Sequence, residues 1–472
     1  MLKGTIYFTI RQIIFVITNF ILHAYLGRTL GPELYGIFGI ISAIIVMSDF
    51  VLSKGVFETV SKFVAQNEKA ASGIMKGALK IMTVACIILG LFLFFFSKEI
   101  AFIMKDPELD RYIKLCSFVI SISGITTVFS GVLNGLRHFG KQAALTVFSS
   151  VIKLLSVSLL VYLGYSVTGA IMGLIIAEVS GLLLAVMVCR IRGVHAEFNG
   201  REMAQFGLQM IAVGLFASVI MNIDLLALKT IIKSNYEIGL YTCATAIAKI
   251  GLILMYPVSL TVIPIISKSL SDGNMKHTEQ SIISALKLTI AFVLPVSLVI
   301  MGSSKNLIFV LYGEQYVPAY AALNILMLGT IFFSIKAVLY NIIVAGGYPR
   351  YIICLGVFSL AIDILLLWYL IDKMGMIGAA TASTVTHFLG FMISYRYVAR
   401  KFMIHKAWMS FVRVAGASIV IYMIAAIYSP AGIVLVLYYG LLLLVYVIIL
   451  MVIKEINLID LIRKLRMGDD SL

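Results

Sequence analysis

The chain has 472 residues, of which 61% are hydrophobic and only 12% are charged. Soluble globular chains are nearer half apolar and a quarter charged, so this composition excludes a soluble globular protein. The formal net charge of +15 does not indicate nucleic acid binding, because the lysines and arginines lie in short loops between apolar runs, where they set membrane topology. The five cysteines show no metal-ligand spacing and no close pairing, so we expect packing thiols and neither a metal nor a cofactor.

Apolar runs of about 18 or more residues recur along the whole chain, and each is long enough to cross a bilayer core of about 30 Å. The first run is too long for a signal-peptide core, and no small-residue cleavage pattern follows it. The sequence therefore predicts an all-α polytopic membrane protein. Fourteen spans are expected, near 5–26, 37–57, 76–97, 112–133, 144–163, 168–189, 204–228, 239–265, 282–303, 321–345, 350–371, 376–397, 409–428 and 432–453.

The distribution of basic residues predicts the orientation of these spans. One side of the membrane, which carries both termini and the even-numbered loops, holds 25 lysines and arginines, and the other side holds nine. Basic residues in short loops accumulate on the cytoplasmic side. We therefore expect a multi-pass protein of the plasma membrane with its N- and C-termini in the cytoplasm.

The chain also repeats itself. The segment from Asn235 to Tyr241 echoes the segment from Glu33 to Phe38, and further matches follow in the same order at offsets of 207 to 210 residues: 77–80 with 284–287, 147–149 with 357–359, and 169–170 with 378–379. We predict two parallel six-helix lobes, 1–200 and 201–403, followed by two extra helices and a short cytoplasmic tail over 404–472. In such repeats the substrate site lies between the copies near the bilayer midplane.

Several ionisable residues fall inside the predicted spans, where they are costly and commonly face a cavity or a partner. Two repeat offsets relate members of this set, because Lys153 corresponds to Asp363 and Glu178 corresponds to His387. We interpret the set as the wall of a water-filled cavity; the alternative is that these charges neutralise one another and only hold the bundle together. The expected substrate-binding residues are Arg11, Lys153, Lys249 and Lys336, and the expected ion-coupling or cavity-lining residues are Asp49, Glu178, Asp224, Asp363 and His387.

Sequence signatures of several enzyme classes are missing. We find no phosphate-binding Gly-Lys-Ser/Thr loop, no His-Glu metal motif, no nucleophile elbow and no large loop with paired acids. A membrane enzyme that builds or cuts a glycan would need such a loop. We therefore expect that the chain is not an enzyme.

The run from Leu26 to Phe38, with Gly31, Pro32 and Gly36, is followed by a span and then by the segment from Ser53 to Phe63. This run resembles the N-terminal signature of polysaccharide flippases. These are the O-antigen and lipid-linked oligosaccharide transporters of the multidrug/oligosaccharidyl-lipid/polysaccharide exporter superfamily. The resemblance implies alternating access, in which the headgroup of a polyprenyl-(pyro)phosphate-linked oligosaccharide crosses through a central basic cavity from the cytoplasmic to the outer leaflet while its tail stays in lipid.

Two alternatives share the implied fold. A cation-coupled multidrug antiporter would depend on the acids, although the first span contains Arg11 and His23 and no acid. A peptidoglycan lipid-precursor flippase would also use a basic cavity. The expected partners are the lipid-linked glycan, membrane lipids, a coupling ion (H⁺ or Na⁺) and polysaccharide assembly enzymes. The sequence does not identify the glycan, the lipid carrier or the driving force.

Overall fold

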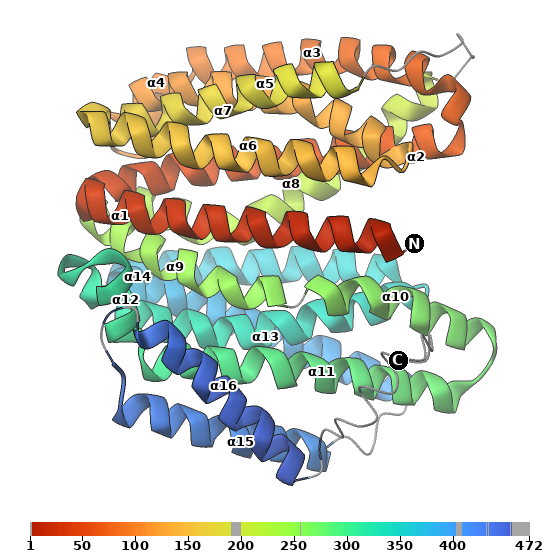
Figure 1. The fold of residues 1–472 in the computed structure, drawn as a ribbon, viewed down its shortest axis with the longest axis vertical. Helices are drawn as coiled ribbons and strands as arrows, with labels where there is room; N and C mark the ends of the chain where they lie inside the picture. The colour runs from red at the N-terminus through yellow and green to blue at the C-terminus, as the bar shows by residue number, and fades with distance from the viewer. Residues whose placement is uncertain are drawn as a thin grey trace. The chain divides into compact units, whose positions relative to one another are not determined.

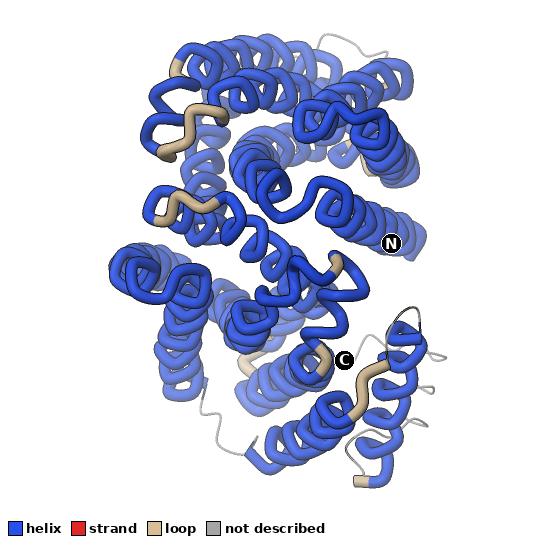
Figure 2. Tube along the Cα trace, turned by 90° about the vertical axis from the view of Figure 1, so that its left-hand side faces the viewer, coloured by secondary structure: helices blue, strands red, loops and turns tan. Residues whose placement is uncertain are grey.

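The computed structural model describes residues 2–189, 200–254, 256–402, 408–430, 432, 434–453 and 455. Throughout these ranges the regular secondary structure is helical, without a strand (Figure 2), so the predicted all-α fold class is confirmed. The α-helices labelled in Figure 1 are α1 (Leu2–Leu52), α2 (Glu58–Gln66), α3 (Ala71–Phe95), α4 (Ser97–Ile103), α5 (Leu109–Gly135), α6 (Phe139–Leu160), α7 (Ser166–Val188), α8 (Gly200–Ile231), α9 (Asn235–Leu254), α10 (Tyr256–Ser271), α11 (Met275–Gly302), α12 (Ser304–Tyr312), α13 (Tyr320–Ala345), α14 (Pro349–Phe402), α15 (Trp408–Ile427) and α16 (Val434–Val452).

Eight helical stretches in the described ranges are long and apolar enough to cross a membrane, and three shorter apolar helices accompany them. Three of the eight are 50 to 57 residues long, which is more than twice the length of a single crossing. Each of these three bends sharply where the backbone is left-handed: at Gly31 (φ 73°) in α1, at Gly164 (φ 91°) before α7, and at Gly375 (φ 58°) in α14. With each bent stretch counted as two crossings, the eight stretches and the short helices Phe411–Ile427 and Leu437–Val452 cover thirteen of the predicted spans, and the predicted span 239–265 falls on α9 and α10. A multi-pass membrane protein is therefore confirmed.

The chain forms two compact units, Met1–Thr242 and Cys243–Leu472. The boundary falls inside α9, so this helix belongs to the first unit at its start and to the second unit afterwards. The lobe limits at residues 200 and 403 stay a prediction. Of the predicted cytoplasmic tail beyond residue 453, only Glu455 lies within the described residues.

In the first unit, α1 packs against α6 and α8, α3 packs against α5, and α7 packs against α5 and α6. Glycines let two of these pairs approach closely. A Cβ added at Gly173 on α7 would lie 2.6 Å from the backbone of Val157 on α6, and one added at Gly124 on α5 would collide with Cys86 on α3. The hydrophobic effect does not drive helices together within lipid. Small residues at helix crossings stabilise the association instead, because they let the two backbones pack closely.

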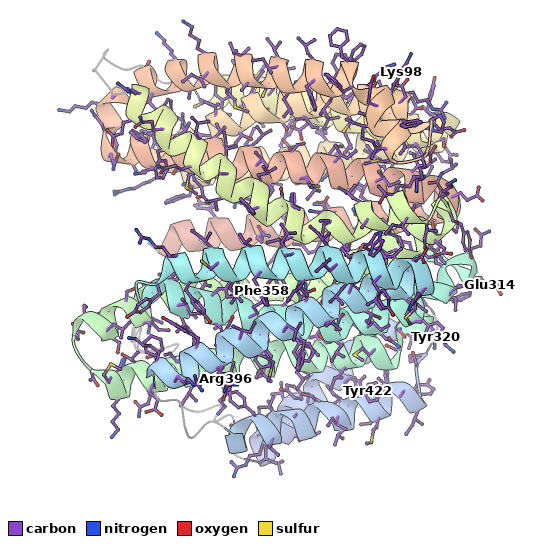
Figure 3. The ribbon with its side chains drawn as sticks, turned by 180° about the vertical axis from the view of Figure 1, so that it is seen from behind. Lys98, Glu314, Tyr320, Phe358, Arg396 and Tyr422 are labelled. Carbon is purple, nitrogen blue, oxygen red and sulfur yellow. The ribbon has the colours of Figure 1, made fainter. Side chains whose placement is uncertain are left out.

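In the second unit, α13 packs against α10, α11 and α14, and the hairpin of α15 and α16 packs on α11. The hairpin is held at both ends. The Glu455 carboxylate pairs with Lys287 of α11 at 2.6 Å and with Arg413 of α15 at 3.4 Å, and at the opposite end Asn306 Nδ2 donates to the Ser429 carbonyl at 2.7 Å. Figure 3 labels Tyr422 on α15 and Tyr320 at the start of α13. The two extra helices are therefore an integral part of the second unit.

Local backbone features recur in the two halves of the chain. Asn67 caps a helical turn by accepting from the Ala70 N–H, and Asn274 accepts from the His277 N–H in the same way, 207 residues later. Left-handed backbone positions recur at separations of 208 to 210 residues: Lys105 (φ 54°) with Gly313 (φ 97°), Arg137 (φ 58°) with Gly347 (φ 84°), and Ser166 (φ 52°) with Gly375 (φ 58°). These separations match the offsets read from the sequence, so the repeat extends to turn geometry.

Candidate functional site

The first intramembrane cluster surrounds Lys153 on α6. Its ammonium Nζ donates to Asn19 Oδ1 on α1 at 2.6 Å and lies 5.4 Å from the ring centre of Phe15, one turn earlier on α1. Lys153 and Asn19 are half-buried. An amide oxygen and an aromatic face both stabilise an ammonium ion that has left bulk water.

Two acids complete this first cluster. Asp49, on the second half of α1, accepts a hydrogen bond from Ser123 Oγ of α5 at 2.8 Å. Glu178 lies on α7, and the charge of Lys153 interacts with both carboxylates. The fold thus gathers three ionisable groups from α1, α6 and α7 of the first unit, each half-buried.

The second cluster surrounds Lys336 on α13, which is only 5% exposed. Its Nζ lies 3.2 Å from His387 Nδ1 on α14, and its charge interacts with Asp363 on the same helix as the histidine. Asp363 is 3% exposed and accepts from Thr386 Oγ1 at 3.0 Å. Because a lysine ammonium only donates hydrogen bonds, this contact makes His387 Nδ1 the acceptor.

Aromatic and small residues shape the space around Lys336. Its Nζ lies 5.2 Å from the ring centre of Phe333 and 5.8 Å from that of Tyr340. The Phe333 ring also meets the His387 ring edge to face at 5.0 Å. Gly390 makes room, since a Cβ there would lie 2.8 Å from Lys336 Cδ. The lysine is therefore held between rings, with its position fixed by packing.

The structure thus brings together six of the nine residues that the sequence singled out, three in each unit. Lys153 and Glu178 lie in the first cluster, and their repeat counterparts Asp363 and His387 lie in the second. Sequence reasoning missed Ser123 and Thr386, because serine and threonine are common in membrane spans and carry no distinguishing signal in a single sequence.

The other three residues lie elsewhere. Asp224 on α8 accepts from the hydroxyl of Tyr241 on α9 at 2.6 Å. Arg11 is half-buried near the start of α1, and Lys249 is exposed on the later part of α9. The roles predicted for all nine residues, substrate binding or ion coupling, stay predictions.

Metal-ligating side chains do not gather among the residues that the structure describes. No group of three or more histidine, cysteine, aspartate or glutamate side chains there could hold a metal ion. The two clusters instead combine ammonium groups with carboxylates, amides and hydroxyls. This chemistry suits a hydrated, oxygen-rich ligand such as a phosphate or a sugar.

Comparisons with known proteins agree with this chemistry. A Shigella flexneri protein named as an O-antigen transporter is 22% identical over 376 residues, covering 76% of this chain and 88% of that protein. A Haloferax volcanii glycan biosynthesis flippase is 20% identical over 385 residues, covering 79% and 78%. The solved lipid II flippase MurJ, in its inward closed conformation, shares the fold with a TM-score of 0.76 at 15% identity, covering 98% of this chain and all of that chain. The family model described as polysaccharide biosynthesis protein matches residues 25–321, so the chain belongs to the polysaccharide biosynthesis protein family.

Proposed function

We propose that this protein is a flippase that moves a polyprenyl-(pyro)phosphate-linked oligosaccharide from the cytoplasmic to the outer leaflet. The observation that carries the proposal is the two lysines, half-buried Lys153 and buried Lys336, that the fold places at the centre of the two intramembrane clusters. Phosphate oxygens accept charge-assisted hydrogen bonds from lysine at about twice the strength of neutral ones. No bond of the glycan is made or broken, so no catalytic residue is required.

The acids of each cluster have a part in this proposal. A lysine deprived of water loses its proton unless a negative or strongly accepting group lies nearby. Asp49 and Glu178 beside Lys153, and Asp363 beside Lys336, supply negative charge of this kind while the site is empty. An arriving phosphate then competes with Asn19 and His387 as a hydrogen-bond acceptor, and with the carboxylates for the charge of each lysine. Binding is therefore reversible, as transport requires.

The proposed direction rests on orientation. With 25 basic residues on one side and nine on the other, we infer that both termini lie in the cytoplasm. The headgroup enters from that side, and alternating access releases it outside. H⁺ or Na⁺ as the coupling ion, and polysaccharide assembly enzymes as partners, belong to the same proposal.

Purified protein in liposomes tests the proposal, with a fluorescent polyprenyl-pyrophosphate oligosaccharide and its arrival in the outer leaflet as the signal. We expect transport by the wild type and loss of transport in Lys153→Ala and Lys336→Ala. Lys249→Ala tests whether that exposed lysine belongs to the site. Lys98→Ala is the matched control, because Lys98 is an exposed lysine on the short helix α4 (Figure 3). Transport that survives both cluster substitutions would refute the site, and a wild type inactive toward every lipid-linked glycan tried would refute the function.

A multidrug antiporter is the second candidate, because two acids flank Lys153 in the first cluster. It predicts the opposite pattern of loss. Asp49→Asn would abolish cation efflux from loaded liposomes, whereas Lys153→Ala would leave it intact. A peptidoglycan lipid-precursor flippase is separated from our first candidate only by the glycan transported, so both lipid-linked substrates belong in the assay.

A further inference from the structure

A buried ion pair lies outside the two clusters, at the end of a membrane span of the first unit. Lys229, in the last turn of α8, is fully buried, and its Nζ donates to Asp106 Oδ2 at 2.7 Å. Lys229 also donates to Asn235 Oδ1 at the start of α9, and Asn235 Nδ2 donates to Asp106 Oδ2 at 2.9 Å. The three side chains form a closed triangle, which we call the outer triangle.

The backbone presents Asp106 to this triangle by a specific turn. At the end of α4 the Asp106 N–H donates to the Ala101 carbonyl and the Lys105 N–H donates to the Phe102 carbonyl, both at 3.0 Å. This pattern is a Schellman motif, and Lys105 takes the left-handed conformation (φ 54°) that usually falls to glycine there. The Glu108 N–H then donates to Asp106 Oδ1 at 3.2 Å, so both carboxylate oxygens are occupied.

The triangle adjoins a crossing of two glycines. Gly36 follows the bend of α1, and a Cβ there would collide with the Asn235 carbonyl; Gly239 lies on the first turns of α9, and a Cβ there would collide with the Pro32 carbonyl. Asn235 therefore belongs to both features. These two glycines lie in the segments that echo each other in the sequence, so the matching motifs of the repeat meet here.

An ion pair at this position favours a contact that can open and close reversibly. An ion pair buried in protein is commonly no more stable than well-packed apolar residues of similar volume, because both charges lose their water. Once separated, however, the charged groups are hydrated again, whereas an apolar contact would stay exposed to water. A contact that must open and close in each transport cycle therefore separates more easily when charged side chains form it than when apolar side chains such as leucine do.

We propose that the outer triangle and the Gly36–Gly239 crossing form a latch, which holds the bend of α1 and the extracytoplasmic ends of α5, α8 and α9 together and releases when the headgroup leaves. The inference rests on the proposed function for alternating access and for the orientation of the loops. α9 transmits the opening, because it begins at the latch and continues from the first unit into the second.

The native thiol of Cys243 reports the opening. It follows Gly239 by one helical turn, so it lies on the same face of α9, and it is fully buried. The other four cysteines are replaced by serine or alanine, and a membrane-impermeant maleimide is added outside liposomes. Asp106→Asn and Lys229→Met remove one charge each. The control is Glu108→Gln, an acid two residues from Asp106 whose side chain is 65% exposed and pairs only at the surface with Arg111.

We expect the labelling rate of Cys243 to rise at least about tenfold in both single variants, because a broken buried pair strongly favours the separated state. Glu108→Gln should label at the wild-type rate. Equal rates in folded single variants would overturn the latch. Should the single variants fail to fold, the charge swap Asp106→Lys with Lys229→Asp decides: slow labelling supports the latch and fast labelling overturns it. The readout needs no glycan, so a protein that opens but transports nothing would overturn only the proposed function.

Discussion

Replacement of glycine by alanine should lower the stability of the protein at the Gly36–Gly239 crossing and raise it at a glycine whose surroundings are open. Gly36→Ala adds a methyl group where the backbone of Asn235 already lies, so α1 and α9 must move apart. Overpacking of this kind costs about 1–3 kcal/mol. Alanine in a helix is otherwise favoured over glycine by about 0.5–1 kcal/mol. The net expectation is a loss of stability of between about 0 and 2.5 kcal/mol.

Gly440→Ala is the matched control. Gly440 lies inside α16 and nothing comes within 4 Å of a Cβ there, so only the favourable helix effect remains. We expect this variant to be more stable by about 0.5–1 kcal/mol. Gly416→Ala on α15 serves as a second control for the same reason.

The assay is the midpoint of thermal unfolding of purified protein in one detergent, compared among the wild type and the three variants. The expected order is Gly36→Ala lowest, then the wild type, then Gly440→Ala. A midpoint for Gly36→Ala at or above that of Gly440→Ala would show that the crossing is not close-packed. The crossing would then no longer support the latch.

Three further predictions concern charged groups. Asn19→Leu removes the amide oxygen that Lys153 contacts at 2.6 Å and should cost about 1.5–3 kcal/mol, measured as a lowered unfolding midpoint. Glu455→Gln removes the shared partner of Lys287 and Arg413 and should lower the midpoint by the equivalent of about 1–3 kcal/mol, since both partners are partly exposed; Glu99→Gln, an exposed acid, should not. Burial raises the pKa of the Asp106 carboxyl, but the hydrogen bonds from Lys229 and Asn235 together outweigh this effect. The pKa of Asp106 therefore lies below its ordinary value of 3.8. The stabilisation by a carboxyl of lowered pKa is present above its ordinary value and is lost as pH falls through the lowered one, so the unfolding midpoint of the wild type should exceed that of Asp106→Asn by the same amount from pH 8 to about pH 4.

Much of the fold was predictable, because membrane spans are easily recognised in the sequence as long apolar runs. A run of about 20 apolar residues has few alternatives to a spanning helix, and the all-α fold and the family were confirmed. The repeat was also visible, since its offsets recur at Asn67 and Asn274 and at the left-handed positions. The short helices α4 and α12 were not predicted, because they lie between spans and their sequences carry no strong periodic signal.

The candidate site was only partly predictable, since helix rotation cannot be read from an almost uniformly apolar sequence. Charge inside a span pointed to Lys153, Glu178, Asp363 and His387, but their partners Ser123 and Thr386 look like ordinary span residues. The outer triangle was missed for the opposite reason. Asp106 and Lys229 lie in predicted loops, where charge is expected, and only the fold shows that both are buried.

The repeat suggests why the two clusters differ in charge. A duplicated site would begin with identical residues. At the corresponding positions of the repeat, however, Lys153 is matched by Asp363 and Glu178 is matched by His387. Each unit nevertheless retains one lysine paired with at least one acid, and in the second unit that lysine comes from another helix, α13. A lysine with an acidic neighbour is thus kept in each unit, while the positions that supply the two charges change. Burial of an unpaired charge is costly, so any loss of one charge would have favoured a compensating change nearby. Reversal of Lys153 and Glu178 together should therefore disturb stability less than reversal of either alone.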